Sequence, residues 1–268
     1  MDASPAFRPD SRLELSRRRL LQLGGLIVAT TGACSKESAA DPTSPAPPPP
    51  PVVKARPLQA PTMPTTPPVV PASHVVLCRD AWGANPPRPG GTPQTPVRMT
   101  IHHTAVALGD NTNAPSRLRQ HQRYHQDTHG WIDIAYHLSV DRNGNIYELR
   151  KPELVGDTAT SYNPSGHFLV VCEGNFDEEQ VTEAQLNGAA VAFAWAAQRF
   201  GIPTDTLAGH RDFSPDTTCP GADLYTHIAS GDLQNRVNGL LAAGPVDLHS
   251  ICGPEASAAV ADIEAGLR

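Results

Sequence analysis

Hydrophobic and polar residues alternate between residues 97 and 104, a segment that ends in a pair of histidines. This period of two is typical of a strand with one buried face. One face carries Val97, Met99, Ile101 and His103, and the other carries Arg98, Thr100, His102 and Thr104. We therefore expect a strand that presents His102 on its polar face and directs His103 into the core.

Two longer segments carry the signals that begin and end helices. Residues 113–128 are predicted to form a helix, because Asn113 is a suitable cap and Gly130 follows the last turn. A second helix is predicted to begin after Thr182, which forms a capping box with Gln185, and to stop at Gly201.

The remaining periodic segments predict strands. Residues 134–140 and 145–149 are expected to form a hairpin that turns at Asn143-Gly144, and residues 168–172 a short buried strand. Strands separated by helices indicate an α/β fold, a central mixed β-sheet flanked by helices. We assign one catalytic domain to residues 73–230. Residues 231–268 are interpreted as a C-terminal helical extension, with helices at 233–241 and 256–267.

The N-terminal 34 residues have the layout of an export signal. Arg17, Arg18 and Arg19 precede a short apolar run, and the small residues before Cys34 resemble a lipobox. Paired arginines before a modestly apolar segment also resemble a twin-arginine signal. We expect a lipid on Cys34 to hold the mature protein in the cell envelope, on the periplasmic face, with an outer membrane favoured where one exists.

Composition separates this signal from the folded domain. Residues 41–72 hold 13 of the 28 prolines, so residues 35–72 are predicted to be a disordered, extended linker. The formal net charge is −6, and removal of the first 34 residues leaves −8. A domain this acidic has no broad basic surface for nucleic acid, and we expect a monomer that holds its ligand in a specific cleft.

The strongest chemical signal lies between Gly209 and Gly221. His210 and Cys219 stand nine residues apart, and imidazole nitrogen and thiolate sulfur are both zinc ligands. A catalytic zinc needs a third protein ligand, and the alternation of the first strand points to His102. Two histidines and one cysteine leave the fourth position open, as catalytic zinc sites require.

Six short motifs follow one another across residues 75–225. They are CRDAWGA at 78–84, IHHT at 101–104, GWIDIAYH at 130–137, DRNGNIYE at 141–148, GNF at 174–176 and GHRDFSPDTTCPG at 209–221. In this order they resemble the motifs of peptidoglycan-recognition proteins and phage amidase-lysozymes. The resemblance implies zinc held by His102, His210 and Cys219, with Tyr136 beside the open position and Thr217 in a secondary, hydrogen-bonding role.

The resemblance also implies a reaction and a ligand. A groove on one side of the sheet would hold the glycan-peptide of peptidoglycan, and zinc-dependent hydrolysis would cut the amide between N-acetylmuramic acid and L-alanine. Two other functions stay open. A peptidoglycan-binding receptor would have the groove without the chemistry, and a zinc peptidase would cut within the stem peptide. A complete set of ligands favours an enzyme over a receptor.

Several residues depart from the family pattern or have other interpretations. Related recycling amidases carry a glutamate base where this chain has Val171. Glu173 has the same parity as Val171 and is an alternative base.

His121 and His125 stand at i and i+4, where packing is favoured over metal binding. Cys78 and Cys252 flank the domain, and an oxidising compartment would allow a disulfide between them.

Overall fold

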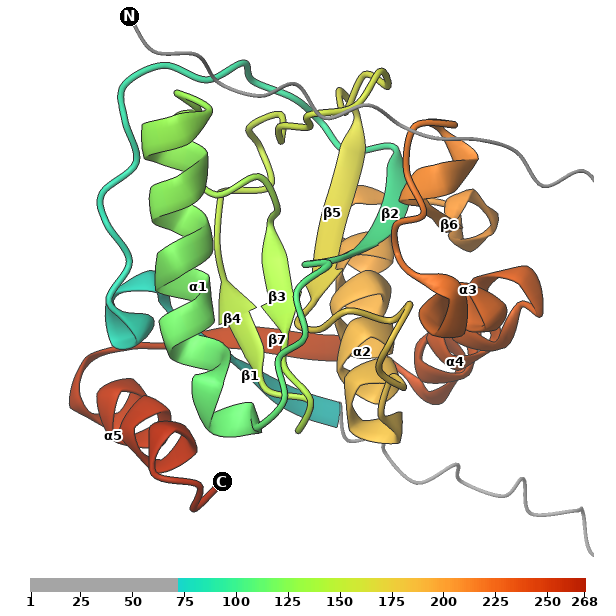
Figure 1. The fold of residues 1–268 in the computed structure, drawn as a ribbon. Coiled ribbons are helices and arrows are strands. Elements are labelled where there is room, and N and C mark those ends of the chain that lie inside the picture. Colours follow the sequence, from blue (N-terminus) through green and yellow to red (C-terminus); the bar gives the residue numbers. More distant parts are fainter. Residues whose placement is uncertain (1–71) are drawn as a thin grey trace, which may run out of the picture. The chain divides into compact units, whose positions relative to one another are not determined.

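The structure is a computed structural model that describes residues 72–268. The predicted export signal, Cys34 and the predicted linker up to residue 71 lie outside the described residues. Within this part, seven strands form one sheet in the order β6-β2-β5-β3-β4-β1-β7 (Figure 1). The strands are β1 (Ala72–Leu77), β2 (Arg98–His103), β3 (Leu138–Val140), β4 (Ile146–Glu148), β5 (His167–Cys172), β6 (Ala208–Gly209) and β7 (Val246–Ile251).

The sheet is mixed, as predicted. Only β3 and β4 run antiparallel among these seven strands, as a hairpin, and all other neighbours are parallel. The longer helices are α1 (Ala114–Arg123), α2 (Glu183–Phe200), α3 (Ala222–Ala229), α4 (Asp232–Ala243) and α5 (Gly253–Glu264). Shorter helical turns are η1 (Arg79–Trp82), η2 (Asn111–Asn113), η3 (Tyr124–Thr128), η4 (Thr204–Thr206) and η5 (His210–Asp212).

Helices cover both faces of the sheet. On one face α2 packs against the apolar side of β2, β3 and β5, with Phe193 and Ile101 completely buried in the same cluster. On the other face α1 and α5 lie together (Figure 1), and Leu118 and Ile263 pack with Leu77 and Val171. The side chains of β2 therefore alternate between the two faces of the sheet, as predicted. Met99 and Ile101 point toward α2, and His102 lies on the opposite face.

Local signals in the sequence explain both ends of α2. Thr182 Oγ1 accepts a hydrogen bond from the Gln185 backbone N–H at 3.0 Å, and the Gln185 side chain accepts one from the Thr182 N–H. Gly201 ends the helix in the left-handed conformation that glycine adopts without strain. The capping box and the stop at Gly201 are thus confirmed.

Other element boundaries differ from the predictions. The first hairpin strand begins at Leu138 rather than residue 134, and the helix predicted at 113–128 is α1 followed by the wider turn η3. The C-terminal extension is not purely helical. Its helices α4 and α5 were predicted, but between them β7 pairs with β1 along six residues and completes the sheet.

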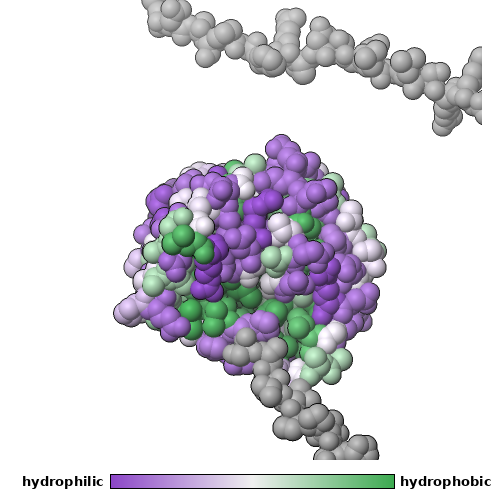
Figure 2. Space-filling model, turned by 90° about the horizontal axis from the view of Figure 1, so that it is seen from below, coloured by the Kyte–Doolittle hydropathy of each residue, from purple (hydrophilic) through white to green (hydrophobic). Residues whose placement is uncertain are grey.

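The surface seen from below in Figure 2 is hydrophilic over most of its area, with hydrophobic residues gathered mainly in the lower half of the view. Among the described residues, the exposed large hydrophobic side chains are Val97, Val106, Tyr124 and Leu267. No helix within residues 72–268 has the length and apolar character needed to cross a bilayer.

Candidate metal centre and groove

The pairing of β2 with β6 brings two histidines together. Ile101 is the register partner of Gly209, so the next residues, His102 and His210, lie side by side at the carboxyl ends of two parallel strands. Their ring centroids are 4.7 Å apart. Both side chains are buried, with 2% and 8% of their surface exposed.

Cys219 reaches the same point from the loop before α3. Its Sγ accepts a hydrogen bond from the His103 backbone N–H at 3.4 Å and lies 3.6 Å from His102 Nδ1. The loop folds back on η5, because the Arg211 N–H donates to the Cys219 carbonyl at 2.9 Å. Gly221 is required there, since a Cβ at this position would lie 2.6 Å from the Phe176 backbone.

The resulting cluster suits a zinc ion. Ligand atoms of His102, His210 and Cys219 all lie within 4.8 Å of one another, the one such group among residues 72–268. His102 Nδ1 lies 3.6 Å from Cys219 Sγ, a separation that suits two ligands of one zinc ion, with a Zn–S bond of about 2.3 Å and a Zn–N bond of about 2.0–2.1 Å. Two imidazoles and one thiol are a donor set of catalytic zinc sites.

Electrostatics keep both imidazoles neutral. Burial is the main cause that lowers the pKa of His102 well below its usual value, and the neighbouring His210 lowers it further. Burial also lowers the pKa of His210 to about 4. A neutral imidazole has a free lone pair, so both rings are ready to bind a cation at neutral pH. Burial raises the pKa of the Cys219 thiol to about 12, and a bound cation would reverse this preference.

Tyr136 and Thr217 both line the groove beside the cluster. The Tyr136 ring centroid lies 5.0 Å from that of His102. Burial raises the pKa of the Tyr136 hydroxyl, so the group stays protonated and able to donate. Thr217 Oγ1 accepts a hydrogen bond from the Cys219 backbone N–H at 3.1 Å. The threonine therefore supports the loop that carries the thiol.

Two residues that the sequence analysis did not single out hold His210 in place. Thr160 Oγ1 lies 2.8 Å from His210 Nε2, within hydrogen-bond distance. The Tyr162 ring packs against the His210 ring at a centroid distance of 4.8 Å, and its buried hydroxyl has no hydrogen-bond partner among the described residues. Both residues come from the loop before β5, whose sequence carries no spacing that would have linked it to His210.

A groove of about 340 Å³ opens over the cluster. One wall is aromatic, and its members are Tyr124, His125, His129 and Trp131. The His129 and Trp131 rings stack with their centroids 4.4 Å apart, so both rings belong to this wall. Polar residues also line the groove, among them Asp157, Thr158 and Thr160.

The other chemically interesting residues lie outside the cluster. His103 Nδ1 accepts the Phe176 N–H at 3.3 Å, as expected of a histidine satisfied by the core. His125 Nδ1 accepts the Ala135 N–H at 3.2 Å. Glu173 is completely buried, accepts a hydrogen bond from Ser139, and does not line the groove. Its position does not favour the alternative of a general base.

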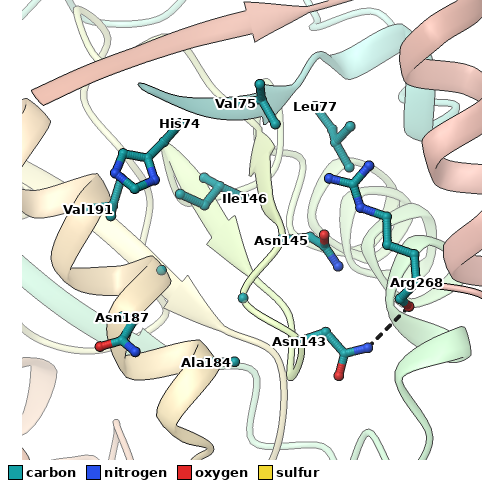
Figure 3. A pocket seen from close by; sticks show the side chains of 12 residues that line it. His74, Val75, Leu77, Asn143, Asn145, Ile146, Ala184, Asn187, Val191 and Arg268 are labelled. Atoms are coloured by element: carbon teal, nitrogen blue, oxygen red, sulfur yellow. Dashed lines mark hydrogen bonds between the residues drawn. The ribbon is translucent and has the colours of Figure 1, made fainter. Parts of the chain in front are cut away.

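A second cavity of about 450 Å³ lies away from this centre (Figure 3). Its lining includes His74, Asn145 and Asn187, and the Asn143 side chain donates to the Arg268 carbonyl at 3.1 Å across one side (Figure 3). No Asp, Glu or Cys side chain is among the described residues that line it. The candidate metal ligands line the smaller groove instead.

Comparisons with known proteins find the same family that the sequence motifs resemble. The family described as N-acetylmuramoyl-L-alanine amidase matches residues 92–222. The human N-acetylmuramoyl-L-alanine amidase is 38% identical over 58% of this chain, but the match spans only 27% of that enzyme's length. Peptidoglycan-recognition protein SC2 of Drosophila melanogaster is 34% identical over 57% of this chain and 84% of its own length.

Solved structures with this fold include the wild-type Drosophila peptidoglycan-recognition protein LB. It is 29% identical, with a TM-score of 0.53, over 59% of this chain and 94% of its own. Peptidoglycan recognition protein LE, solved with tracheal cytotoxin, is 31% identical, with a TM-score of 0.53, over 58% and 92% of the two chains.

Proposed function

Because this chain belongs to the family of N-acetylmuramoyl-L-alanine amidases and peptidoglycan-recognition proteins, we propose that it hydrolyses peptidoglycan in a zinc-dependent reaction. The proposed bond is the amide between the lactyl group of N-acetylmuramic acid and L-alanine. One observation carries the proposal: the ligand atoms of His102, His210 and Cys219 converge within 4.8 Å in a groove that Tyr136 also lines.

The ligand set favours catalysis over a structural role. Structural zinc sites are closed by four protein ligands, whereas catalytic sites keep one position open. The cluster supplies three. A bound zinc would act as a Lewis acid on the amide carbonyl and lower the pKa of water at the open position.

The chain's own side chains have distinct tasks in this reaction. Tyr136 would donate a hydrogen bond to the carbonyl oxygen as negative charge develops on it, and its hydroxyl, which stays protonated, supports this role. Thr217 holds the Cys219 loop through the Cys219 N–H. Thr160 holds the His210 ring through Nε2, which leaves Nδ1 of that ring free to bind the metal.

The groove suits a glycan-peptide. Stacked His129 and Trp131 offer an apolar face for a sugar ring or a peptide stem, and the threonines that also line the groove offer hydrogen-bonding groups. The tracheal cytotoxin bound to peptidoglycan recognition protein LE is a monomeric diaminopimelic acid-type peptidoglycan. We therefore propose this class of muropeptide as the first substrate to test.

Two other functions make different predictions for the same site. A receptor would bind peptidoglycan and leave it intact, and a family that includes recognition proteins makes this the main alternative. A zinc peptidase would use the same three ligands and cut a bond inside the stem peptide. The convergence of the three ligands argues against a receptor, which needs no open metal position.

Zinc dependence is the direct test of the site. Chelation of the purified protein should abolish release of peptides from peptidoglycan, and added zinc should restore it. Cys219→Ser should weaken zinc binding and remove turnover, while Cys252→Ser, at an exposed cysteine outside the cluster, should leave turnover unchanged. Full activity of Cys219→Ser in the presence of chelator would refute the proposal.

We also propose that the protein is exported and acts as a monomer tethered to the cell envelope through lipid on Cys34. The sequence before Cys34 supports this, and one chain supplies all three candidate ligands. Cys34→Ala should move the protein from the membrane fraction to the soluble fraction with unchanged specific activity. A wild-type protein that is already soluble after export would contradict the anchor.

A further inference from the structure

Two cysteines far apart in the sequence lie at the same end of neighbouring strands. Strands β1 and β7 pair in parallel, and their last register partners are Leu77 and Ile251. Cys78 and Cys252 follow directly. The Cys78 backbone N–H donates to the Ile251 carbonyl at 3.1 Å, so the pairing continues to this point.

This register satisfies the geometry of a disulfide. Neighbouring strands lie about 4.7–4.9 Å apart, and a disulfide joins Cα atoms that are roughly 4.4–6.8 Å apart. The thiols already interact: a side-chain hydrogen bond with Cys78 is the largest cause that raises the pKa of Cys252 to about 11. Both remain separate thiols in this structure, with Cys78 buried and Cys252 exposed.

The other described cysteines are not alternative partners. Strand β5, which carries Cys172, is separated from β1 by β3 and β4. Three strand spacings are roughly 14 Å, beyond the reach of a disulfide. Cys219 lies at the candidate metal centre beside β2, farther along the sheet. Among residues 72–268 the register thus leaves Cys252 as the cysteine that can pair with Cys78.

We propose that Cys78 and Cys252 form a disulfide that fastens the C-terminal extension to the catalytic domain. The two thiols lose two protons and two electrons as the S–S bond forms, and a disulfide of a thiol–disulfide oxidoreductase or of glutathione accepts them and becomes two thiols. The proposal needs an oxidising compartment but does not depend on the reaction that the groove catalyses.

The disulfide would hold strand β7 and helix α5 in place against the rest of the domain. In the sheet formed by residues 72–268, edge strand β7 has no neighbour beyond β1, and α5 packs Ala256 and Ile263 into the cluster that also holds Leu118 of α1. The loop closed by the bond has roughly 170 residues and contains all three candidate metal ligands. Closing such a long loop restricts the unfolded chain and thereby stabilises the folded domain.

The chain allows a direct test, because trypsin separates the four described cysteines into four peptides. The purified full-length, zinc-loaded protein is treated with oxidised glutathione at about pH 8.5, where more thiolate is present. It is then alkylated and digested without reductant. We expect the peptide that ends at Arg79 to be linked to the peptide that begins at Val237, with Cys172 and Cys219 recovered as alkylated thiols.

Stability provides the second measurement. Reduction should lower the melting temperature of the oxidised wild type by about 5–15 °C. The same reduction should leave the melting temperature of Cys252→Ser unchanged, and this exposed position makes misfolding of the variant a small concern. Alkylation of both Cys78 and Cys252 after oxidation, a link between Cys252 residues of two molecules, or an equal shift in Cys252→Ser would each overturn the proposal.

Discussion

Thr160 Oγ1 and His210 Nε2 lie 2.8 Å apart, which joins a loop residue to one of the three candidate metal ligands. A ring nitrogen that donates its proton to a fixed partner leaves the other nitrogen deprotonated and orients the ring. With Nε2 at Thr160, Nδ1 is the nitrogen of His210 that is free to face the cluster.

Thr160→Val removes this hydrogen bond at nearly constant volume. Zinc affinity should fall about 10–100-fold, the usual cost of losing a partner of a metal-binding histidine. Thr160→Ser keeps a hydroxyl and should retain most of the affinity. Competition with a chromophoric chelator measures both variants. Equal zinc affinity of Thr160→Val and wild type would mean that packing by Tyr162 alone orients the ring.

Tyr136→Phe tests the proposed hydrogen bond in the transition state. The hydroxyl contributes mainly when charge develops on the carbonyl oxygen, so kcat should fall about 10²–10³-fold while KM changes little. Steady-state kinetics on a soluble muropeptide separate the two parameters. A rise in KM at constant kcat would instead assign Tyr136 to ground-state binding.

Glu173 is a completely buried carboxyl under α1. Its Oε1 accepts a hydrogen bond from Ser139, its Oε2 has no hydrogen-bond partner among the described residues, and His121 Nδ1 is 4.0 Å from Oε2. Burial is the main cause that raises its pKa to about 8, and Asp141 raises it further, while the Ser139 hydrogen bond and Arg117 oppose the shift. The folded protein therefore binds a proton here that the unfolded chain releases above its ordinary pKa of 4.5.

This raised pKa predicts a pH dependence of stability. The stabilisation from Glu173 is complete below pH 4.5 and is lost as the pH rises to about 8. Glu173→Gln mimics the protonated carboxyl, so its melting temperature should exceed that of wild type at pH 8 by on the order of 5 °C, with little difference at pH 5.

Calorimetry of the two proteins across this range isolates Glu173 from the buried histidines. Those histidines, including His210, have lowered pKa values and oppose folding only toward acid, in both proteins alike. Parallel wild-type and Glu173→Gln profiles would show that Glu173 is ionised in the folded state.

The sequence predicted those parts of the site that depend on local periodicity. Alternation along β2 assigned His102 to the face opposite the Ile101 cluster, and the structure has it there. Parity also assigned Glu173 to the face of Val171, and the structure agrees, since Glu173 lies near His121 of α1. The odd or even position of a residue along a strand predicts the face of the sheet on which it lies, but not which element covers that face. The burial of Glu173 could therefore not be predicted.

Contacts between distant segments were not predictable in the same way. Strand β6 has only two residues, too few for any periodicity, yet its pairing with β2 places His210 beside His102. Strands β1 and β7 pair although most of the chain lies between them in the sequence, and neither strand was predicted. Thr160 and His210 lie in hydrogen-bond distance although fifty positions separate them in the sequence. Such pairings are determined by the assembled sheet rather than by local residue preference.

Analysis of the reaction products identifies the bond that the protein cuts. Purified peptidoglycan is digested with the zinc-loaded protein, and released fragments are identified by mass and by labelling of new amino groups and reducing ends. We predict new amino termini on L-alanine alone, with no new reducing sugar ends, because the cluster is suited to amide hydrolysis. New amino termini on any other residue would identify a peptidase. Binding without any cleavage by the zinc-loaded protein would identify a receptor and rule out the proposed amidase.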